Sequence, residues 1–300
     1  MPNSTDLTEG RVPWPSVSLV GLGAMGLPMA RILAAAGPLT VWNRTPREVP
    51  GARRAAALAD AMADVVITVL PDIDDVRDVL LGSAARPGLL AGAAARAVLP
   101  IVVVCGTVSP VAVRALAAEM TEHGVTIVDA PLSGGVLGAA EGRLSIMVGG
   151  SEQDFAVVRN VLEPCAARIT LMGPTGAGAA TKLCNQIVVA ETVVALSEAF
   201  ALARSEGIDP EKLADALGSG LAASEVLQQK RRHWIEESFE PGGTVAYQVK
   251  DLGYAAEMAR AGGLALPALA AADALFRRSM DAGDGSLDHT GVYRVIARAE

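Results

Sequence analysis

The sequence predicts an α/β fold, a doubly wound parallel β-sheet covered by helices, followed by an all-helical carboxyl-terminal part. Three observations carry this prediction. Short apolar runs alternate with amphipathic segments from Val17 to about Met172, which is typical of a parallel sheet with helices on both faces. A glycine-rich loop, Gly21–Gly26, directly follows the first apolar run. After Gly173 the strand-like runs disappear, and Ala, Leu and Glu recur at helical spacing.

The first half of the chain contains the expected strands and the helices that cover them. Each strand is a short apolar run bounded by turn residues. We expect strands at residues 17–20, 39–42, 65–70, 101–104, 126–129, 144–148 and 168–171, and helices at about 25–36, 74–81, 111–123 and 152–162.

The second half contains only helices in this prediction, at about 178–206, 210–218, 224–237, 250–261 and 267–282. Asp209 precedes Pro210, which is the pattern of an acidic cap before a helix that begins with proline. The first of these helices would span roughly 43 Å at about 1.5 Å per residue, long enough to line a cleft between two domains. We therefore expect a flexible tail at 1–15, a sheet domain at 16–172 and a helical domain at 173–300.

The loop Gly21-Leu22-Gly23-Ala24-Met25-Gly26 lies between a predicted strand and a predicted helix, the context of a dinucleotide-binding turn. In such a loop the first glycine makes the turn, the second lets the backbone approach a pyrophosphate, and the third lets helix and strand pack closely. The helix N-terminus then favours the phosphates. The six residues predict a Rossmann-type nucleotide site.

The end of the second predicted strand carries no acid. Asn43, Arg44 and Thr45 follow it, where an NAD site usually has an aspartate or glutamate that accepts hydrogen bonds from the ribose. An acid repels a 2′-phosphate, whereas an arginine attracts it. We expect NADP(H) as the preferred cofactor, with NAD(H) as the alternative, contacted by these three residues.

A serine–glycine turn follows the strand expected at 126–129. Ser133, Gly134 and Gly135 would present a hydroxyl and successive amides, which form a concavity suited to a carboxylate. A plain turn can have the same sequence, so the turn alone leaves both interpretations open.

A single lysine lies on the long apolar helix. Lys182 is the only basic residue between Arg168 and Arg204, and Asn185 and Gln186 follow it on the same helical face. A polar stripe on an apolar helix requires polar partners or a wet cleft. This setting favours a functional lysine over a solvated surface lysine.

Taken in order, these motifs resemble those of the β-hydroxyacid dehydrogenases, a family that includes 3-hydroxyisobutyrate dehydrogenase, tartronate semialdehyde reductase and the glyoxylate/succinic semialdehyde reductases. The resemblance covers nearly the whole chain from about Val17. Its elements are GLGAMGLPMA at 21–30, VLPD at 69–72, TVSP at 107–110, DAPLSGG at 129–135, GAGAATKLCNQ at 176–186 and KDLG at 250–253.

The resemblance implies an NADP(H)-dependent interconversion of a small β-hydroxy acid and its semialdehyde or keto form. It also implies that Lys182 is the catalytic general acid and base, acting on the reacting oxygen. The remaining roles that it implies are substrate carboxylate contacts from Ser133, Gly134, Gly135 and Asn185, beside which we place Gln186, and cofactor contacts from Leu70, Pro71, Thr107 and Lys250.

The chain also departs from the family pattern. Val104 and Gly106 stand where many members have an acid and a serine before the TVSP threonine, and Ile32 replaces a common asparagine. The usual DxSA near the carboxyl terminus is replaced by 288–291, Asp-His-Thr-Gly. These departures leave the substrate open.

Two alternative functions stay open at this point. An imine reductase has a similar two-domain plan, but its relatives often have aspartate or tyrosine at the position of Lys182. A non-catalytic nucleotide-binding module would be expected to lose that lysine or gain a basic extension. A 6-phosphogluconate dehydrogenase is less favoured because the chain is short for that family.

The composition indicates which cellular compartment and which binding partners to expect. The formal net charge of −8 disfavours nucleic acid, and the short basic clusters, among them Arg53-Arg54, are expected on solvated helix surface. The three cysteines, Cys105, Cys165 and Cys184, are expected to be buried reduced thiols rather than a disulfide or metal site. We expect a cytoplasmic homodimer or homotetramer that binds a small carboxylate substrate, without a membrane segment. Trp234 and Tyr247 are expected in the aromatic core, with a place beside the substrate as the alternative.

Overall fold

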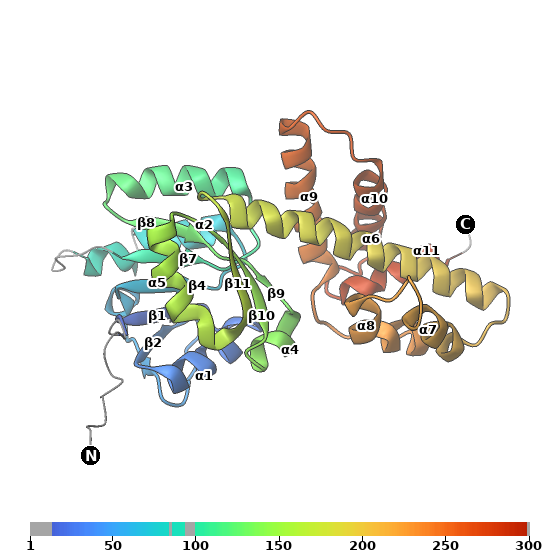
Figure 1. Cartoon of the computed structure of the whole chain (residues 1–300), viewed down its shortest axis with the longest axis horizontal. Helices are drawn as coiled ribbons and strands as arrows, with labels where there is room; N and C mark the ends of the chain where they lie inside the picture. Colours follow the sequence, from blue (N-terminus) through green and yellow to red (C-terminus); the bar gives the residue numbers. More distant parts are fainter. Residues whose placement is uncertain (1–13, 84–85, 94–99, 299–300) are drawn as a thin grey trace, which may run out of the picture.

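The computed structural model describes residues 14–83, 86–93 and 100–298, and Figure 1 shows the two parts that the sequence predicts. A mostly parallel sheet with helices on both faces forms the first part, and helices form the second. The tail expected at 1–15 lies almost entirely outside the described residues.

The described strands of the first part form one twisted sheet in the order β11-β10-β8-β7-β4-β1-β2-β3, with β9 paired to β10. The hairpin β5–β6 stands apart from it. The strands are β1 (Val17–Val20), β2 (Leu39–Trp42), β3 (Arg53–Arg54), β4 (Val65–Thr68), β5 (Gly82–Ser83), β6 (Arg86–Pro87), β7 (Ile101–Val104), β8 (Thr126–Asp129), β9 (Leu132–Ser133), β10 (Leu144–Gly149) and β11 (Ala166–Gly173).

Strand direction departs from the all-parallel expectation at one side of the sheet. β10 pairs antiparallel with β8, and β11 pairs parallel with β10 across helix α5. The chain leaves β8 and returns through β9, which is antiparallel to β10, without the long crossover that a parallel neighbour requires. The sheet is therefore parallel from β3 to β8 and reverses for its last two strands.

Two apolar clusters cover the two faces of the sheet. Helices α1 and α5 pack on one face, and α2 and α3 on the other. The helices and 3-10 turns of this part are α1 (Gly26–Ala36), η1 (Leu58–Ala61), α2 (Ile73–Leu81), η2 (Leu89–Gly92), α3 (Pro110–Glu122), α4 (Gly135–Ala140), α5 (Glu152–Leu162) and η3 (Glu163–Cys165).

The second part is built around α6 (Ala177–Ser205), which runs out of the sheet part and through the helical part in Figure 1. Its core stacks Trp234 on Phe200 with ring centroids 5.6 Å apart, while the indole N–H donates to Ser197 Oγ. The other elements are α7 (Pro210–Gly218), α8 (Glu225–Glu236), α9 (Val245–Ala261), α10 (Pro267–Asp281), η4 (His289–Val292) and α11 (Tyr293–Ile296).

Most expected elements are confirmed within a few residues, and the differences have local causes. Helix α9 begins at Val245, five residues before the expected start, because Thr244 caps it. Arg53 and Arg54 form the edge strand β3 rather than helix surface. Cys184 is exposed, against the expectation of three buried thiols, because only one side of α6 faces a core.

By length and composition α6 is also a helix that could cross a membrane, a test that a core helix passes equally. Its Leu183, Ala190, Val193 and Phe200 belong to the apolar core of the helical part. About a third of the apolar window of α6, 33%, is buried inside the structure.

Candidate active site

A cavity of about 580 Å³ lies at the carboxyl ends of the parallel strands. Strands β1, β2, β4, β7 and β8 are paired in register, so that Val20, Trp42, Thr68, Val104 and Asp129 end at one edge of the sheet. The loops that follow them form one wall of the cavity, and α6 and α9 form the other. Open α/β sheets bind ligands at this edge.

The glycine loop has the geometry that its sequence predicts. Gly21 has φ +100°, and a Cβ there would lie 2.4 Å from Val69 O, while a Cβ on Gly26 would lie 1.9 Å from Gly21 O. A Cβ on Gly23 would meet nothing within 4 Å. The loop is thus closed on its protein side and open at Gly23, where a pyrophosphate needs room.

Asn43 has a structural contact beside its place on the cavity wall. Its Oδ1 accepts a hydrogen bond from Leu22 N at 2.8 Å, and its Nδ2 donates to Thr45 O at 2.7 Å. Arg47 donates to Leu22 O from the other side. Asn43 therefore fixes the glycine loop against the end of β2, and Leu22 itself is buried rather than on the cavity.

Asp129 determines where α6 begins. This carboxylate, the last residue of β8, is fully buried and accepts hydrogen bonds from Gly176 N at 2.6 Å and Ala179 N at 2.7 Å. Burial raises the pKa of Asp129, and the N–H donors of the helix start oppose that rise. A Cβ on Gly178 would lie 2.2 Å from Met147 O, so glycine is needed for this close approach.

Lys182 lies in the second turn of α6 and lines the cavity with only 8% of its surface exposed. Burial lowers the pKa of Lys182 to about 8, although the nearby Asp251 carboxylate acts in the opposite direction. A lysine with this pKa can give a proton as its ammonium and take one as its neutral amine near neutral pH. The position and the pKa both suit acid–base chemistry.

Asp251 was not predicted from the sequence and lies beside Lys182. It is 4% exposed, accepts a hydrogen bond from Gln186 Nε2 at 2.8 Å, and lies 3.5 Å from Lys250 Nζ. Burial raises its pKa, while Lys250 and Lys182 lower it. Gln186 thus holds the counter-charge of Lys182, and the adjacent "KD" letters were the signal available in the sequence.

Helix α9 is attached to the sheet loops by two side chains. Lys250 Nζ donates to Pro71 O at 2.8 Å and also to Thr107 O, while Tyr254 OH donates to Asp72 Oδ2 at 2.5 Å. Lys250 therefore joins two loops that both border the cavity, which fixes the width of the cleft between the two parts.

The serine–glycine turn faces the same cavity. Ser133 Oγ donates to Asn185 Oδ1 at 3.4 Å, and Gly134 and Gly135 have φ of +126° and +65°. Side chains other than glycine rarely adopt these conformations. The turn thus lies opposite the polar face of α6.

The cavity brings together nearly all of the residues that the sequence singled out. Leu22 and Asn185 are the exceptions, since Leu22 is buried and Asn185 reaches the site through Ser133. Residues that the prediction missed include Asp75, Asp78, Arg86, Gly243 and Asp251. Tyr247 lines the cavity rather than the core, whereas Trp234 is buried. The predicted residues that line it are Gly21, Gly23, Ala24, Met25, Gly26, Asn43, Arg44, Thr45, Leu70, Pro71, Thr107, Ser133, Gly134, Gly135, Lys182, Gln186 and Lys250.

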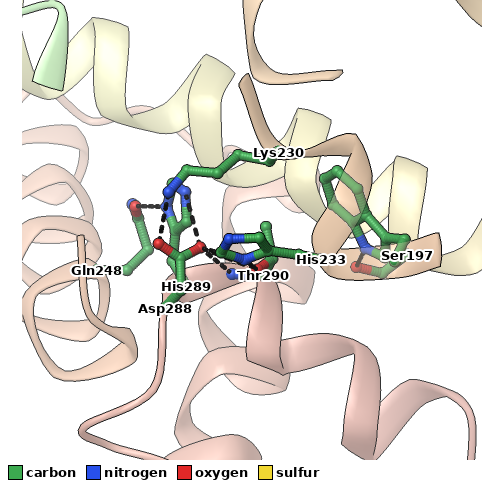
Figure 2. A network of polar contacts seen from close by, with 8 residues as sticks. Ser197, Lys230, His233, Gln248, Asp288, His289 and Thr290 are labelled. Carbon is green, nitrogen blue, oxygen red and sulfur yellow. Dashed lines mark hydrogen bonds and ion pairs between the residues drawn. The ribbon is translucent and has the colours of Figure 1, made fainter. Parts of the chain in front are cut away.

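A polar network lies behind this wall in the helical part (Figure 2). Asp288 is fully buried and contacts Lys230 Nζ at 2.6 Å and Thr290 Oγ1 at 2.9 Å. Burial lowers the pKa of His289 to about 4, with Asp288 opposing and Lys230 assisting. The His289 ring contacts Gln248 Oε1 at 3.3 Å, and Gln248 donates to Gln186 O. The network therefore supports α6 one turn after Lys182.

Two family models match the chain. One describes the NAD binding domain of 6-phosphogluconate dehydrogenase and matches residues 16–173. The other describes the NAD-binding of NADP-dependent 3-hydroxyisobutyrate dehydrogenase and matches residues 176–296. Together they cover both parts of the fold.

Individual relatives are similar over nearly the whole chain. The 2-hydroxy-3-oxopropionate reductase of Escherichia coli K12 is 34% identical, with 93% of this chain and 96% of the relative aligned. The structure of Mycobacterium tuberculosis 3-hydroxyisobutyrate dehydrogenase with L-serine is 30% identical, with a TM-score of 0.80 and coverage of 95% and 99%. Psf3 in complex with NADP+ and 2-OPP is 25% identical, with a TM-score of 0.82 and coverage of 93% and 99%.

The glycine loop, the strand-end cavity and these similarities define the chain as an NAD(P)-dependent dehydrogenase. The residues matched by the two family models and the identity to the relatives also determine its family. The chain belongs to the β-hydroxyacid dehydrogenase family.

Proposed function

We propose that the protein is an NADP(H)-dependent reductase of small semialdehydes or keto acids that carry a carboxylate, which it converts to β-hydroxy acids. The observation that carries this proposal is the buried Lys182 in the cavity of the glycine loop, with its pKa lowered to about 8. The relatives named for 2-hydroxy-3-oxopropionate and 3-hydroxyisobutyrate support the substrate class.

The residues present fit the cofactor. The open space at Gly23 and the cavity volume of about 580 Å³ suit a dinucleotide, which Gly21–Gly26, Leu70, Pro71 and Thr107 would hold. Asn43, Arg44 and Thr45 would contact its adenosine ribose, and the positive Arg44 favours a 2′-phosphate. When bound, the nicotinamide supplies the hydride. Lys250 would define the cleft through its bonds to the Pro71 and Thr107 carbonyls.

Lys182 performs the proton chemistry in this proposal. Its ammonium donates a proton from Nζ to the carbonyl oxygen as that oxygen becomes a hydroxyl, and its positive charge stabilises the developing alkoxide. The amides of Gly134 and Gly135 hold the substrate carboxylate, and Ser133 joins them when its hydroxyl turns its single proton from Asn185 Oδ1 to the carboxylate. In the reverse direction the neutral amine accepts the proton.

A substrate panel tests this function. Short semialdehydes, neutral aldehydes of the same length and a cyclic imine are each incubated with NADPH or NADH, and loss of absorbance at the nicotinamide band is followed. The proposal expects carboxylate-bearing aldehydes with NADPH to give the highest kcat/KM. Equal kcat/KM values for NADPH and NADH would contradict the proposed cofactor preference. Reduction of the imine alone would contradict the proposed reaction and indicate an imine reductase.

Removal of Lys182 tests its role directly. Lys182→Ala is expected to lower kcat by about 10³-fold or more, because both the proton donor and the positive charge are lost. Binding of NADPH, followed by its fluorescence, should persist. The exposed Lys212→Ala is the matched control and should retain full activity. Undiminished turnover in Lys182→Ala would exclude the lysine from the chemistry.

A further inference from the structure

A second, smaller pocket adjoins the cavity at the end of β2. It has a volume of about 380 Å³ and lies between the β3 edge of the sheet and the β5–β6 hairpin. Trp42, Asn43, Arg44 and Arg86 line both this side pocket and the main cavity. The two spaces therefore share part of their walls at these four residues.

The charges of the side pocket differ from those of the main cavity. The described residues that line the side pocket include Arg44, Arg54 and Arg86 and no carboxylate. The adjacent wall of the main cavity carries Asp75 and Asp78 from α2. A dianionic group that reaches this end of the cavity is attracted to the side pocket and repelled by the α2 wall.

Arg86 is held in a position to bind such a group. Its guanidinium carbon lies 5.2 Å from the centroid of the Trp42 ring, over the ring face. Its Nε is buried and makes no hydrogen bond within the described part of the chain. By contrast, Arg54 is engaged by Glu48 at 2.7 Å. Arg86 is therefore stacked in one orientation, and its charge has no carboxylate partner within the described residues, an arrangement that suits a preorganised anion contact.

We propose that Arg86 is a cofactor-specificity residue, which together with Arg44 binds the 2′-phosphate of NADP(H) at the mouth of the side pocket. This inference rests on the proposed NADP(H) preference and adds to it a second cation, from the β5–β6 hairpin rather than from the glycine loop or the end of β2. The two arginines come from different elements, one from the loop after β2 and one from strand β6, and both line the side pocket.

Binding of two nucleotide fragments tests the inference without turnover. Adenosine 2′,5′-bisphosphate and 5′-AMP differ by the 2′-phosphate, and their dissociation constants are measured by calorimetry for the wild-type protein and for Arg86→Gln. The inference expects Arg86→Gln to weaken the bisphosphate about 10-fold or more, as for a lost charge-assisted bond, and to leave 5′-AMP unchanged. Arg53→Gln, an exposed arginine of the same charge on β3, is the control and should change neither value.

The outcomes separate the two levels of the proposal. A wild-type protein that does not prefer the bisphosphate contradicts both the NADP(H) preference and the inference. A wild-type preference that survives Arg86→Gln overturns the inference alone. Equally weakened binding of both fragments also overturns the inference, because Arg86 would then act by positioning Trp42 beside the adenosine rather than by contacting the 2′-phosphate. Thermal unfolding of Arg86→Gln at the wild-type temperature verifies that the variant is folded. Arg86→Lys is expected to retain part of the affinity for the bisphosphate, because lysine keeps the positive charge but lacks the forked donors of the guanidinium.

Discussion

The two ends of the cavity carry cations in opposite surroundings. At the end of β2, Arg44 is exposed and Arg86 is partly buried, and neither forms an ion pair within the described residues. At the start of α6, Lys182 is 8% exposed, and its pKa is lowered to about 8. An arginine keeps its charge at any working pH, which suits binding of an anion. A buried lysine can lose its proton, which suits a reaction in which a proton moves.

The two ends are also supported differently. The glycine loop and Asn43 are held by contacts between neighbouring strands of the sheet. Lys182 depends on the docking of a helix from the other part of the chain, fixed by Asp129 and by Asp251. The reaction end should therefore be the more sensitive to the loss of a single buried polar group.

Asp129→Ala is expected to have the largest effect on stability. It leaves the N–H groups of Gly176 and Ala179 without their acceptor, and two buried unsatisfied donors cost about 3 kcal/mol together. Urea unfolding measures the loss. The control is Asp209→Ala, which removes an exposed helix cap and is expected to cost about 1 kcal/mol.

The same variant also tests the contrast between the two ends. Under conditions in which Asp129→Ala is folded, it should retain affinity for adenosine 2′,5′-bisphosphate while kcat declines, because only the position of Lys182 is disturbed. If the affinity for the bisphosphate and kcat declined together, the two ends of the cavity would depend on the same structural contacts.

The two ends of the cavity also differ in how much of each the sequence predicts, because one rests on neighbouring strands and the other on the docking of a helix. The glycine loop and Asn43-Arg44-Thr45 are contiguous with predictable strands, so local pattern was enough to assign them to one edge of the sheet. Arg86 and Asp251 come from elements whose approach to the cavity depends on tertiary packing. Asp129 was recognised only as the first residue of a motif, because its role as a cap appears when β8 meets α6.

The pH profile of the reaction provides the second prediction, of intermediate size. Reduction requires protonated Lys182, and with a pKa of about 8 its protonated fraction declines about tenfold for each pH unit above that value. The kcat for semialdehyde reduction should therefore be flat below pH 7 and fall above pH 8. Asp251→Asn removes the carboxylate that raises the Lys182 pKa, so its profile should decline at lower pH.

The measurement distinguishes the two ends of the cavity. The dissociation constant of adenosine 2′,5′-bisphosphate should stay level between pH 7.5 and 9, where the arginines do not titrate. A kcat that does not change above pH 8 in both proteins would be evidence against Lys182 as the proton donor.

The smallest expected effect concerns the network behind the cavity wall (Figure 2). Burial lowers the pKa of His289 to about 4, from 6.5 in the unfolded chain. The unfolded chain thus binds a proton that the folded protein does not, and stability is fully present above pH 6.5 and lost as pH falls toward 4. Between pH 7.5 and 5.5 the loss from this residue is about 1 kcal/mol.

Urea unfolding of wild type and His289→Ser at these two pH values measures this contribution. Serine has no proton to bind, so the variant should show a shallower decline in stability between pH 7.5 and 5.5, whatever its stability at pH 7.5. His123→Ser, at an exposed position, should keep the wild-type slope. An unchanged slope in His289→Ser would mean that its imidazole accepts a proton in the folded state as easily as in the unfolded chain. Because the charges of His289 and Lys182 repel each other, such protonation would then lower the lysine pKa further.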